Sequence, residues 1–319
     1  MSDVRAVDAL TEAEAASELA RLAEAILRAD AAYHQNDAPE ISDADYDALK
    51  RRNREIEARF PALKRADSPS DTVGAAPAEG FGKIRHTIRM LSLANAFAPG
   101  DVDDFDARIR RYLNLGPDAP LAYTAEPKID GLTVVLHYND GVFALGATRG
   151  DGEIGEVITP NLRTIRTLPL RLRAPEGGSR RRSAPLAFPT ALVVRGEAVI
   201  YTGDFARFNA AQVAKGARTF ANPRNTASGA LRNLDTALTA AVPISLLCYQ
   251  IVAADGPMPG TQWEALELLR SLGFPVSDVA RRFAALEDAI AYCQSFVEKR
   301  DALPFEIDGM VLKLDDLRL

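Results

Sequence analysis

The first sixty residues repeat apolar positions at the period of an α-helix. Thr11 and Glu14 have the spacing of a capping box, which predicts a helix over residues 12–34. A second helix is predicted to open near Ser42 and to end before Pro61. The two helices would form a hairpin. The buried face of the first would carry Leu19, Leu22, Ala23, Ile26 and Leu27.

The pattern changes over residues 61–82, which are rich in Pro, Gly, Ala and Ser and have little apolar periodicity. Such a composition is typical of a linker. We therefore place a domain boundary near residue 75, with a small helical domain over residues 1–75 and a larger domain over residues 76–319.

The larger domain has the pattern of strands and short helices. Two apolar runs, 132–138 and 142–148, flank Asn139-Asp140-Gly141, whose residues tolerate the positive φ of a tight hairpin turn. Further strands are predicted over 191–201, 244–252 and 306–314, and helices over 204–215, 261–272 and 286–300. Because strands and helices do not alternate regularly, we expect an α+β fold built on antiparallel sheets.

Composition narrows the function classes. The 319 residues are 47% hydrophobic and 26% charged, as in ordinary globular proteins, and we find neither an apolar signal core nor a run as long as a membrane span. We therefore expect a cytoplasmic protein without a membrane partner. Two cysteines cannot form a four-thiolate zinc site, and a net charge of -6 argues against an autonomous DNA-binding surface.

A lysine between two carboxylates is the main candidate for chemistry. In an extended segment Glu126, Lys128 and Asp130 point to the same side, and the run ends in Gly131. A lysine amine in its uncharged form is a nucleophile that can form a covalent intermediate. The alternative is a surface strand with alternating charge.

Three more polar motifs follow in the larger domain. The glycines of Arg149-Gly150-Asp151-Gly152 could let backbone amides approach a phosphate, although a plain turn fits equally well. Arg195 and Glu197 place a charge pair on one strand face, where Glu197 could meet a ligand or form an exposed ion pair. Arg224 and Arg232 lie two helical turns apart and could face DNA phosphates together.

The last motif, residues 306–313, carries carboxylates and a lysine on one predicted strand. Strict alternation would place Lys313 on the face opposite Asp308. A site shared by the two side chains therefore requires a bulge or a twist between them.

In this order along the chain, the motifs resemble the adenylation region of the NAD⁺-dependent bacterial DNA ligases. The resemblance implies a nucleotidyltransferase (ATP-grasp-like ligase adenylation) fold behind a small helical domain. It implies that Lys128 becomes adenylylated, that Glu126 reads the adenine, and that Mg²⁺ assists at Glu197 and Asp308. The nucleotide site would also include Ser92, Leu93, Asp130, Arg149, Glu197, Asp308 and Lys313, and the DNA contacts would come from Arg224 and Arg232.

The helical hairpin distinguishes NAD⁺ from ATP as the nucleotide donor. Its polar residues resemble the nicotinamide mononucleotide pocket of the NAD⁺-using family, and Asp43, Tyr46 and Asp47 share one helix face. A flat, cationic nicotinamide ring suits aromatic rings with carboxylates nearby. The full set is Tyr33, His34, Asp43, Tyr46 and Asp47. The alternative is that Tyr46 is a core aromatic, that the two aspartates are favourable charges near a helix N-terminus, and that His34 is a solvated loop residue.

The expected activity is the first step of nick sealing, in which the enzyme takes AMP from NAD⁺ and releases nicotinamide mononucleotide. The chain stops at Leu319, before the later lysine motif and the DNA-encircling modules of such ligases. We therefore expect poor nick sealing, with nicked double-stranded DNA as a partner of the full-length enzyme and Zn²⁺ only in the missing part. The alternatives are an ATP-dependent lysine nucleotidyltransferase and a non-catalytic NAD- or AMP-binding module.

Overall fold

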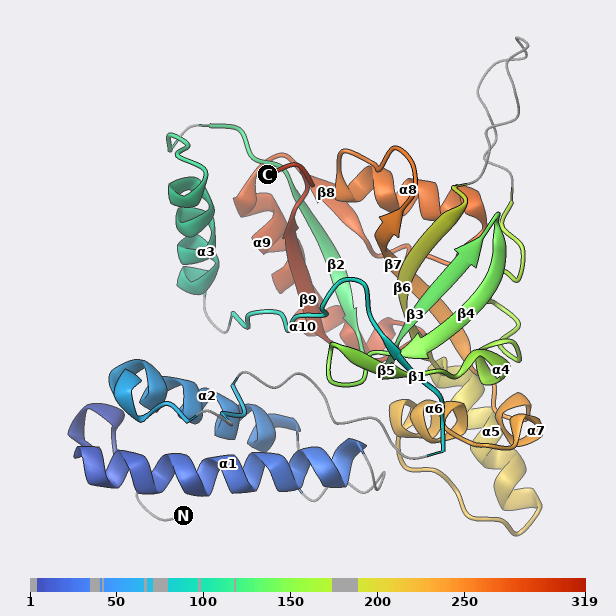
Figure 1. Cartoon of the computed structure of the whole chain (residues 1–319), viewed down its shortest axis with the longest axis horizontal. Helices are drawn as coiled ribbons and strands as arrows, with labels where there is room; N and C mark the ends of the chain where they lie inside the picture. The colour runs from blue at the N-terminus through green and yellow to red at the C-terminus, as the bar shows by residue number, and fades with distance from the viewer. Residues whose placement is uncertain are drawn as a thin grey trace. The chain divides into compact units, whose positions relative to one another are not determined.

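The computed structural model describes residues 5–34, 41, 43–65, 68–70, 80–96, 99–117, 119–173 and 189–319 (Figure 1). Contacts divide the chain into two compact units. The first comprises Met1–Ser92 and Arg149–Glu156, and the second Leu93–Thr148 and Val157–Leu319. The domain boundary near residue 75 stays a prediction. Across the described ranges, we find no helix with the length and apolar character needed to cross a membrane.

The first unit contains the predicted helical hairpin, drawn in blue in Figure 1. Its helices are α1 (Glu12–His34) and α2 (Asp43–Arg59). The capping box forms as predicted, because Glu14 N donates to Thr11 Oγ1 at 3.3 Å and Thr11 N donates to Glu14 Oε2 at 2.9 Å. The apolar faces of the helices pack into a core of Ala15, Leu19, Leu22 and Ile56.

Short elements complete the first unit. Two 3₁₀ turns, η1 (Val7–Ala9) and η2 (Pro61–Leu63), flank the hairpin. Strand β1 (Lys83–Arg85) pairs antiparallel with β5 (Ile154–Glu156), which brings residues 149–156 beside the segment that follows the hairpin.

The second unit holds two antiparallel sheets. The smaller has the strand order β8-β2-β9, with β8 over Arg281–Phe283, β2 over Tyr123–Ile129 and β9 over Ile307–Leu314. The larger has the order β4-β3-β6-β7, with β4 over Val142–Thr148, β3 over Leu132–Asn139, β6 over Ala191–Val199 and β7 over Ser245–Ala254. The predicted β3–β4 hairpin forms, with positive φ at Asp140 and Gly141.

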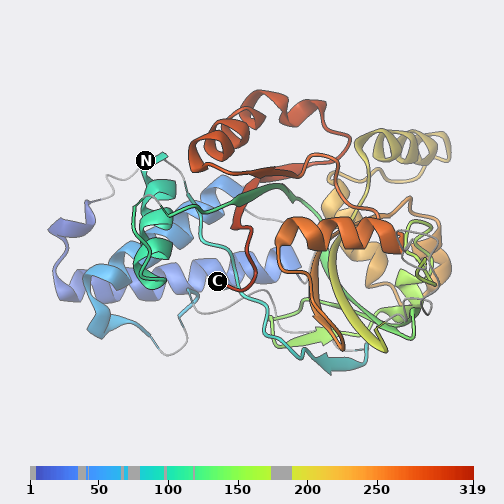
Figure 2. The ribbon, with the colours of Figure 1, turned by 90° about the horizontal axis from the view of Figure 1, so that it is seen from above.

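Helices surround these sheets and confirm the α+β class. They are α3 (Pro99–Tyr112), α4 (Thr159–Leu162), α5 (Thr202–Ala214), α6 (Pro223–Leu231), α7 (Thr236–Ala240), α8 (Gln262–Leu272), α9 (Leu286–Gln294), α10 (Phe296–Lys299) and the 3₁₀ turn η3 (Arg300–Ala302). The helix predicted over 286–300 is interrupted at Ser295, and α3 was not predicted. Helix α8 packs on β7, and both are orange in Figure 2.

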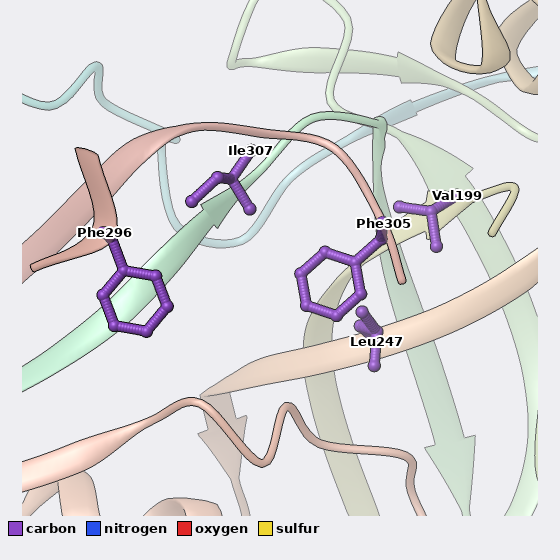
Figure 3. Close-up of a cluster of buried hydrophobic side chains, with 5 residues drawn as sticks. All are labelled: Val199, Leu247, Phe296, Phe305 and Ile307. Carbon is purple, nitrogen blue, oxygen red and sulfur yellow. The ribbon is translucent and has the colours of Figure 1, made fainter. Parts of the chain in front are cut away.

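A buried apolar cluster joins the two sheets of the second unit. Figure 3 shows Phe305 beside Val199 of β6 and Leu247 of β7, with Phe296 on the other side of Ile307. Burying each of these side chains contributes about 1.5–3 kcal/mol. Because Ile307 begins β9, the cluster fixes the β2–β9 pair against the larger sheet.

Candidate active site

The lysine motif occupies β2, the central strand of the smaller sheet. Glu126 is buried, 4% exposed, whereas the side chain of Lys128 is 43% exposed. The interpretation of a surface strand with alternating charge is therefore wrong for Glu126. The Lys128 ammonium forms an ion pair with Asp308 Oδ2 on the neighbouring β9. The candidate nucleophile thus lies where a ligand can reach it.

A β-bulge brings the charges of β9 onto the face of β2 that carries Lys128. Lys128 lies opposite Gly309 and Ile129 opposite Ile307, so Asp308 is the extra residue between them. Gly309 has a φ of 154°, which favours glycine. Of the two irregularities that would let Asp308 and Lys313 share a site, a bulge or a twist, the structure therefore has a bulge.

Lys313 reaches the same face of β2 farther along β9. Its Nζ lies 2.9 Å from Glu126 Oε1, and it also lies 5.5 Å from the ring centroid of Tyr249. Glu126, Lys128, Asp308 and Lys313 are thus brought together as two ion pairs on one face.

Asp130 follows β2 and contacts one of the two arginines expected to bind DNA. Its backbone N donates to Glu306 O at 3.0 Å, and its Oδ1 lies 2.5 Å from an Arg224 guanidinium nitrogen. Asn222 caps α6 and so places Arg224 in its first turn, whereas Arg232 follows the last residue of the helix. In this structure Arg224 therefore supports the lysine motif.

Glycine is required after Asp130 by a close backbone approach. A Cβ on Gly131 would lie 2.5 Å from Ala198 O and 2.8 Å from Glu197 Cγ. The last residue of the K-x-D-G motif thus permits β2 to turn into β3 against β6, beside Glu197.

Glu197 on β6 is the second buried carboxylate of the second unit's candidate site. It is 7% exposed, and it accepts hydrogen bonds from Thr133 Oγ1 at 2.9 Å and from the Tyr249 hydroxyl at 3.1 Å. The exposed ion-pair interpretation of Glu197 is therefore wrong. Sequence reasoning gave Thr133 no function and overlooked Tyr249. The register that sets Thr133 opposite Glu197 comes from strand pairing, which no local signal reveals.

Arg149 belongs to the first unit, apart from the lysine motif's unit. Its carbonyl oxygen lies 3.2 Å from His86 Nε2, and Asp151 Oδ1 accepts from two backbone amides that close the turn. Gly150 is required there, because it has a φ of 57° and a Cβ would lie 1.8 Å from Ile154 O. Ser92 and Leu93 are both exposed and are divided between the two units.

The residues predicted to hold nicotinamide lie on the helical hairpin. Tyr46 is partly buried, and Lys50 Nζ lies 4.9 Å from its ring centroid, so this ring already accommodates a cation. The side chains of Tyr33, His34, Asp43 and Asp47 lie outside the described residues.

Comparison with protein families decides the identity. A model described as NAD-dependent DNA ligase adenylation domain matches residues 78–319. The chain belongs to this family. A second model, DNA ligase-like N-terminal NAD+-binding domain, matches residues 12–74, which include the helical hairpin. The nucleotidyltransferase fold expected from the resemblance is that of this adenylation domain, preceded by a helical part.

Curated relatives of this ligase adenylation region carry the name DNA ligase. The relative from Dinoroseobacter shibae is 52% identical over 98% of this chain and 41% of its own length. Those from Ruegeria pomeroyi and Hyphomonas neptunium are 53% and 48% identical over 97% and 99% of this chain, and 40% and 44% of their own lengths. The chain therefore spans about two fifths of these relatives.

A solved structure, titled mycobacterial DNA ligase D complexed with ATP and MES, matches 61% of this chain and 49% of its own. The identity is 15% and the TM-score 0.34, so this likeness supports no argument about the adenylation domain.

The donor set of the adenylation domain suits a metal ion that arrives with a nucleotide. Among the described residues no three His, Cys, Asp or Glu side chains cluster as a metal site. Magnesium commonly binds through one or two carboxylates together with substrate phosphates and waters. Glu197 and Asp308 fit that pattern as carboxylates, and they do not form a complete cage.

Negative charge accumulates near the end of β2. Burial raises the pKa of Glu306, the charges of Asp130 and Asp308 raise it further, and Arg300 opposes them. The adenylation domain thus keeps several carboxylates close to the Lys128 ion pair, where a bound cation would relieve their repulsion.

Proposed function

We propose that this chain transfers AMP from NAD⁺ to Lys128. The observation that supports it is the half-exposed Lys128 amine on the face of β2 that also presents Glu126. Lys128 Nζ attacks the adenylyl phosphorus, the bond from phosphorus to the bridging oxygen breaks, and nicotinamide mononucleotide leaves with the electron pair. The amine loses its protons to solvent, and a lysine–AMP phosphoramidate remains.

The other site residues bind and orient the dinucleotide in this proposal. Glu126 accepts a hydrogen bond from the adenine, and Lys313, Arg149 and Asp130 complete the nucleotide site with Ser92 and Leu93. Mg²⁺, held by Glu197 and Asp308 with phosphate oxygens, would supply positive charge where negative charge grows on phosphorus.

The N-terminal hairpin holds the departing half of NAD⁺ in the same proposal. The family match over residues 12–74 supports a nicotinamide mononucleotide pocket there. Its residues are Tyr33, His34, Asp43, Tyr46 and Asp47. We keep the domain boundary near residue 75, between the two matched ranges.

The whole protein would seal nicked double-stranded DNA in the cytoplasm. The relatives named DNA ligase, of which the chain spans only part, support the nick-sealing role. Arg224 and Arg232 would contact DNA phosphates. A phosphate would have to compete with Asp130 for Arg224.

Intact-mass measurement after incubation with NAD⁺ and Mg²⁺ tests the proposal. We expect the gain of one AMP in the wild type and none in Lys128→Ala. Lys215→Ala removes an exposed lysine after α5 and should keep the adduct. An adduct that survives Lys128→Ala would defeat the assignment.

Parallel incubation with ATP tests the choice of donor. In the presence of Mg²⁺, NAD⁺ should label the chain and ATP should not. Tyr33→Ala or Asp43→Ala should slow labelling by NAD⁺. Labelling by ATP would favour an ATP-dependent nucleotidyltransferase. Thermal stabilisation by NAD⁺ without an adduct would indicate a non-catalytic binding module.

A further inference from the structure

Gln262, the first residue of α8, bridges the two sheets through its side-chain amide. It is 3% exposed, and its Nε2 donates to Glu126 Oε1 on β2 at 2.8 Å and to the Tyr249 carbonyl oxygen on β7 at 2.9 Å. Both hydrogens of the amide are therefore used. The opposite amide orientation would aim an oxygen at two acceptors, so the hydrogen bonds fix which end faces Glu126.

Hydrogen bonds also fix the backbone at Gln262. Thr261 caps α8 in a complete capping box with Glu264. The backbone N of Gln262 donates to the backbone O of Asp315 at 2.7 Å, and the backbone N of Trp263 donates to Asp315 Oδ1 at 2.9 Å. The start of α8 is thereby anchored to the end of β9, which fixes the position from which Gln262 reaches Glu126.

Gln262 and Lys313 together leave one oxygen of Glu126 for a ligand. Gln262 Nε2 donates to Oε1 at 2.8 Å and Lys313 Nζ forms an ion pair with the same oxygen at 2.9 Å, whereas the part of the chain that the structure describes gives Oε2 no donor. A carboxylate held in this way offers one directed acceptor. Adenine carries an amino donor at position 6, whereas guanine and hypoxanthine carry a carbonyl acceptor there.

We propose that Gln262 is a positioning residue that sets base selectivity, because it holds Glu126 with Oε2 directed at the 6-amino group of adenine. This rests on the proposed function, in which Glu126 reads the base. A site built to accept from an amino group rejects an analogue that presents an acceptor in its place. Without the Gln262 hydrogen bond, the Glu126 carboxylate can turn while it keeps its ion pair with Lys313. The discrimination against a base that carries an acceptor at position 6 then weakens.

The test compares NAD⁺ with nicotinamide hypoxanthine dinucleotide, measuring single-turnover AMP or IMP adduct formation by intact mass. Gln262→Met keeps the length of the side chain and removes its donor. We expect the preference for NAD⁺, expressed as the ratio of the second-order rate constants of adduct formation, to fall about tenfold to hundredfold, the effect of losing one hydrogen bond to a charged group. Gln294→Met changes an exposed glutamine at the end of α9 and should leave the ratio unchanged.

An equal loss with both dinucleotides would show that Gln262 only supports the fold, and would overturn the inference. Should Gln262→Met fail to fold by circular dichroism, Gln262→Leu, which is shorter and also lacks a donor, gives the same comparison. Absence of any adduct in the wild type would defeat the proposed function instead. The selectivity would then be measured as the ratio of affinities for the two dinucleotides from thermal stabilisation, with the same expected fall.

Discussion

Asp315 connects four elements of the second unit, and its removal should destabilise that unit strongly. The residue follows β9 and is fully buried. Its Oδ1 accepts from Thr124 Oγ1 on β2 at 2.7 Å and from Trp263 N on α8 at 2.9 Å. Its Oδ2 accepts from Arg282 Nε on β8 at 2.5 Å.

The expected loss of stability in Asp315→Ala follows from the three hydrogen-bond donors that lose their acceptor. Thr124 is fully buried, so its hydroxyl finds no water, and an unsatisfied buried donor costs about 1–3 kcal/mol. The backbone N–H of Trp263 loses its acceptor at a similar cost. Arg282 is half exposed and can turn to water, so its share is about 0–1 kcal/mol. We expect a fall of about 3–5 kcal/mol in the free energy of unfolding, as for other broken buried pairs.

Urea unfolding followed by tryptophan fluorescence measures this loss. Trp263 is the single tryptophan of the chain and lies on α8, so its signal reports the second unit. Asp316→Ala, at the neighbouring and more exposed aspartate, is the matched control and should change the free energy of unfolding by less than about 1 kcal/mol. A loss below about 1 kcal/mol for Asp315→Ala, at an unchanged urea dependence, would refute the reasoning.

Three further changes test the turn, the bulge and the charges of the site. Gly131→Ala should cost about 1–3 kcal/mol by the same titration, because the new Cβ meets Ala198 O, whereas Gly100→Ala has open space and should be neutral. Gly309→Ala meets no atom within 4 Å, yet its φ should cost about 1–3 kcal/mol and slow adduct formation; normal values for both would exclude strain at the bulge. Glu306 has a raised pKa, so folding favours its protonated form and wild-type stability falls as pH rises through that pKa. The melting temperature of Glu306→Gln, relative to that of the wild type, should therefore rise from pH 4 to pH 7. A difference that stays constant over this range would contradict the reasoning.

Local signals in the sequence predicted the elements well. The Thr11 capping box and the turn at Asp140 form as predicted, because their determinants lie within four residues of one another. Helix α3 was missed, since its sequence is dominated by charged positions. The interruption at Ser295 was missed as well, because the run 286–300 contains no proline or glycine.

The sequence predicted the motifs of the candidate site but not the contacts between their side chains. Strand alternation placed Glu126 and Lys128 on one face and showed that Asp308 and Lys313 needed a bulge or a twist to share a site. The partners of Glu197 and Glu126 could not be predicted, because they come from residues distant in the chain. Gln262, which contacts Glu126, is 136 positions away and carries no motif of its own.

The charges on the Lys128 face of β2 give a physical reason for a further cation in the proposed transfer of AMP. Lys128 pairs with Asp308 and Lys313 pairs with Glu126, so the four charges already balance before a nucleotide binds. The pyrophosphate of NAD⁺ adds two negative charges to this balanced face. An ammonium has no lone pair, so Lys128 must also give up a proton and its contact with Asp308 before Nζ can bond to phosphorus. Of these four side chains Lys313 would then be the remaining cation facing two carboxylates and a pyrophosphate, which is the physical reason for including Mg²⁺ in the proposed step.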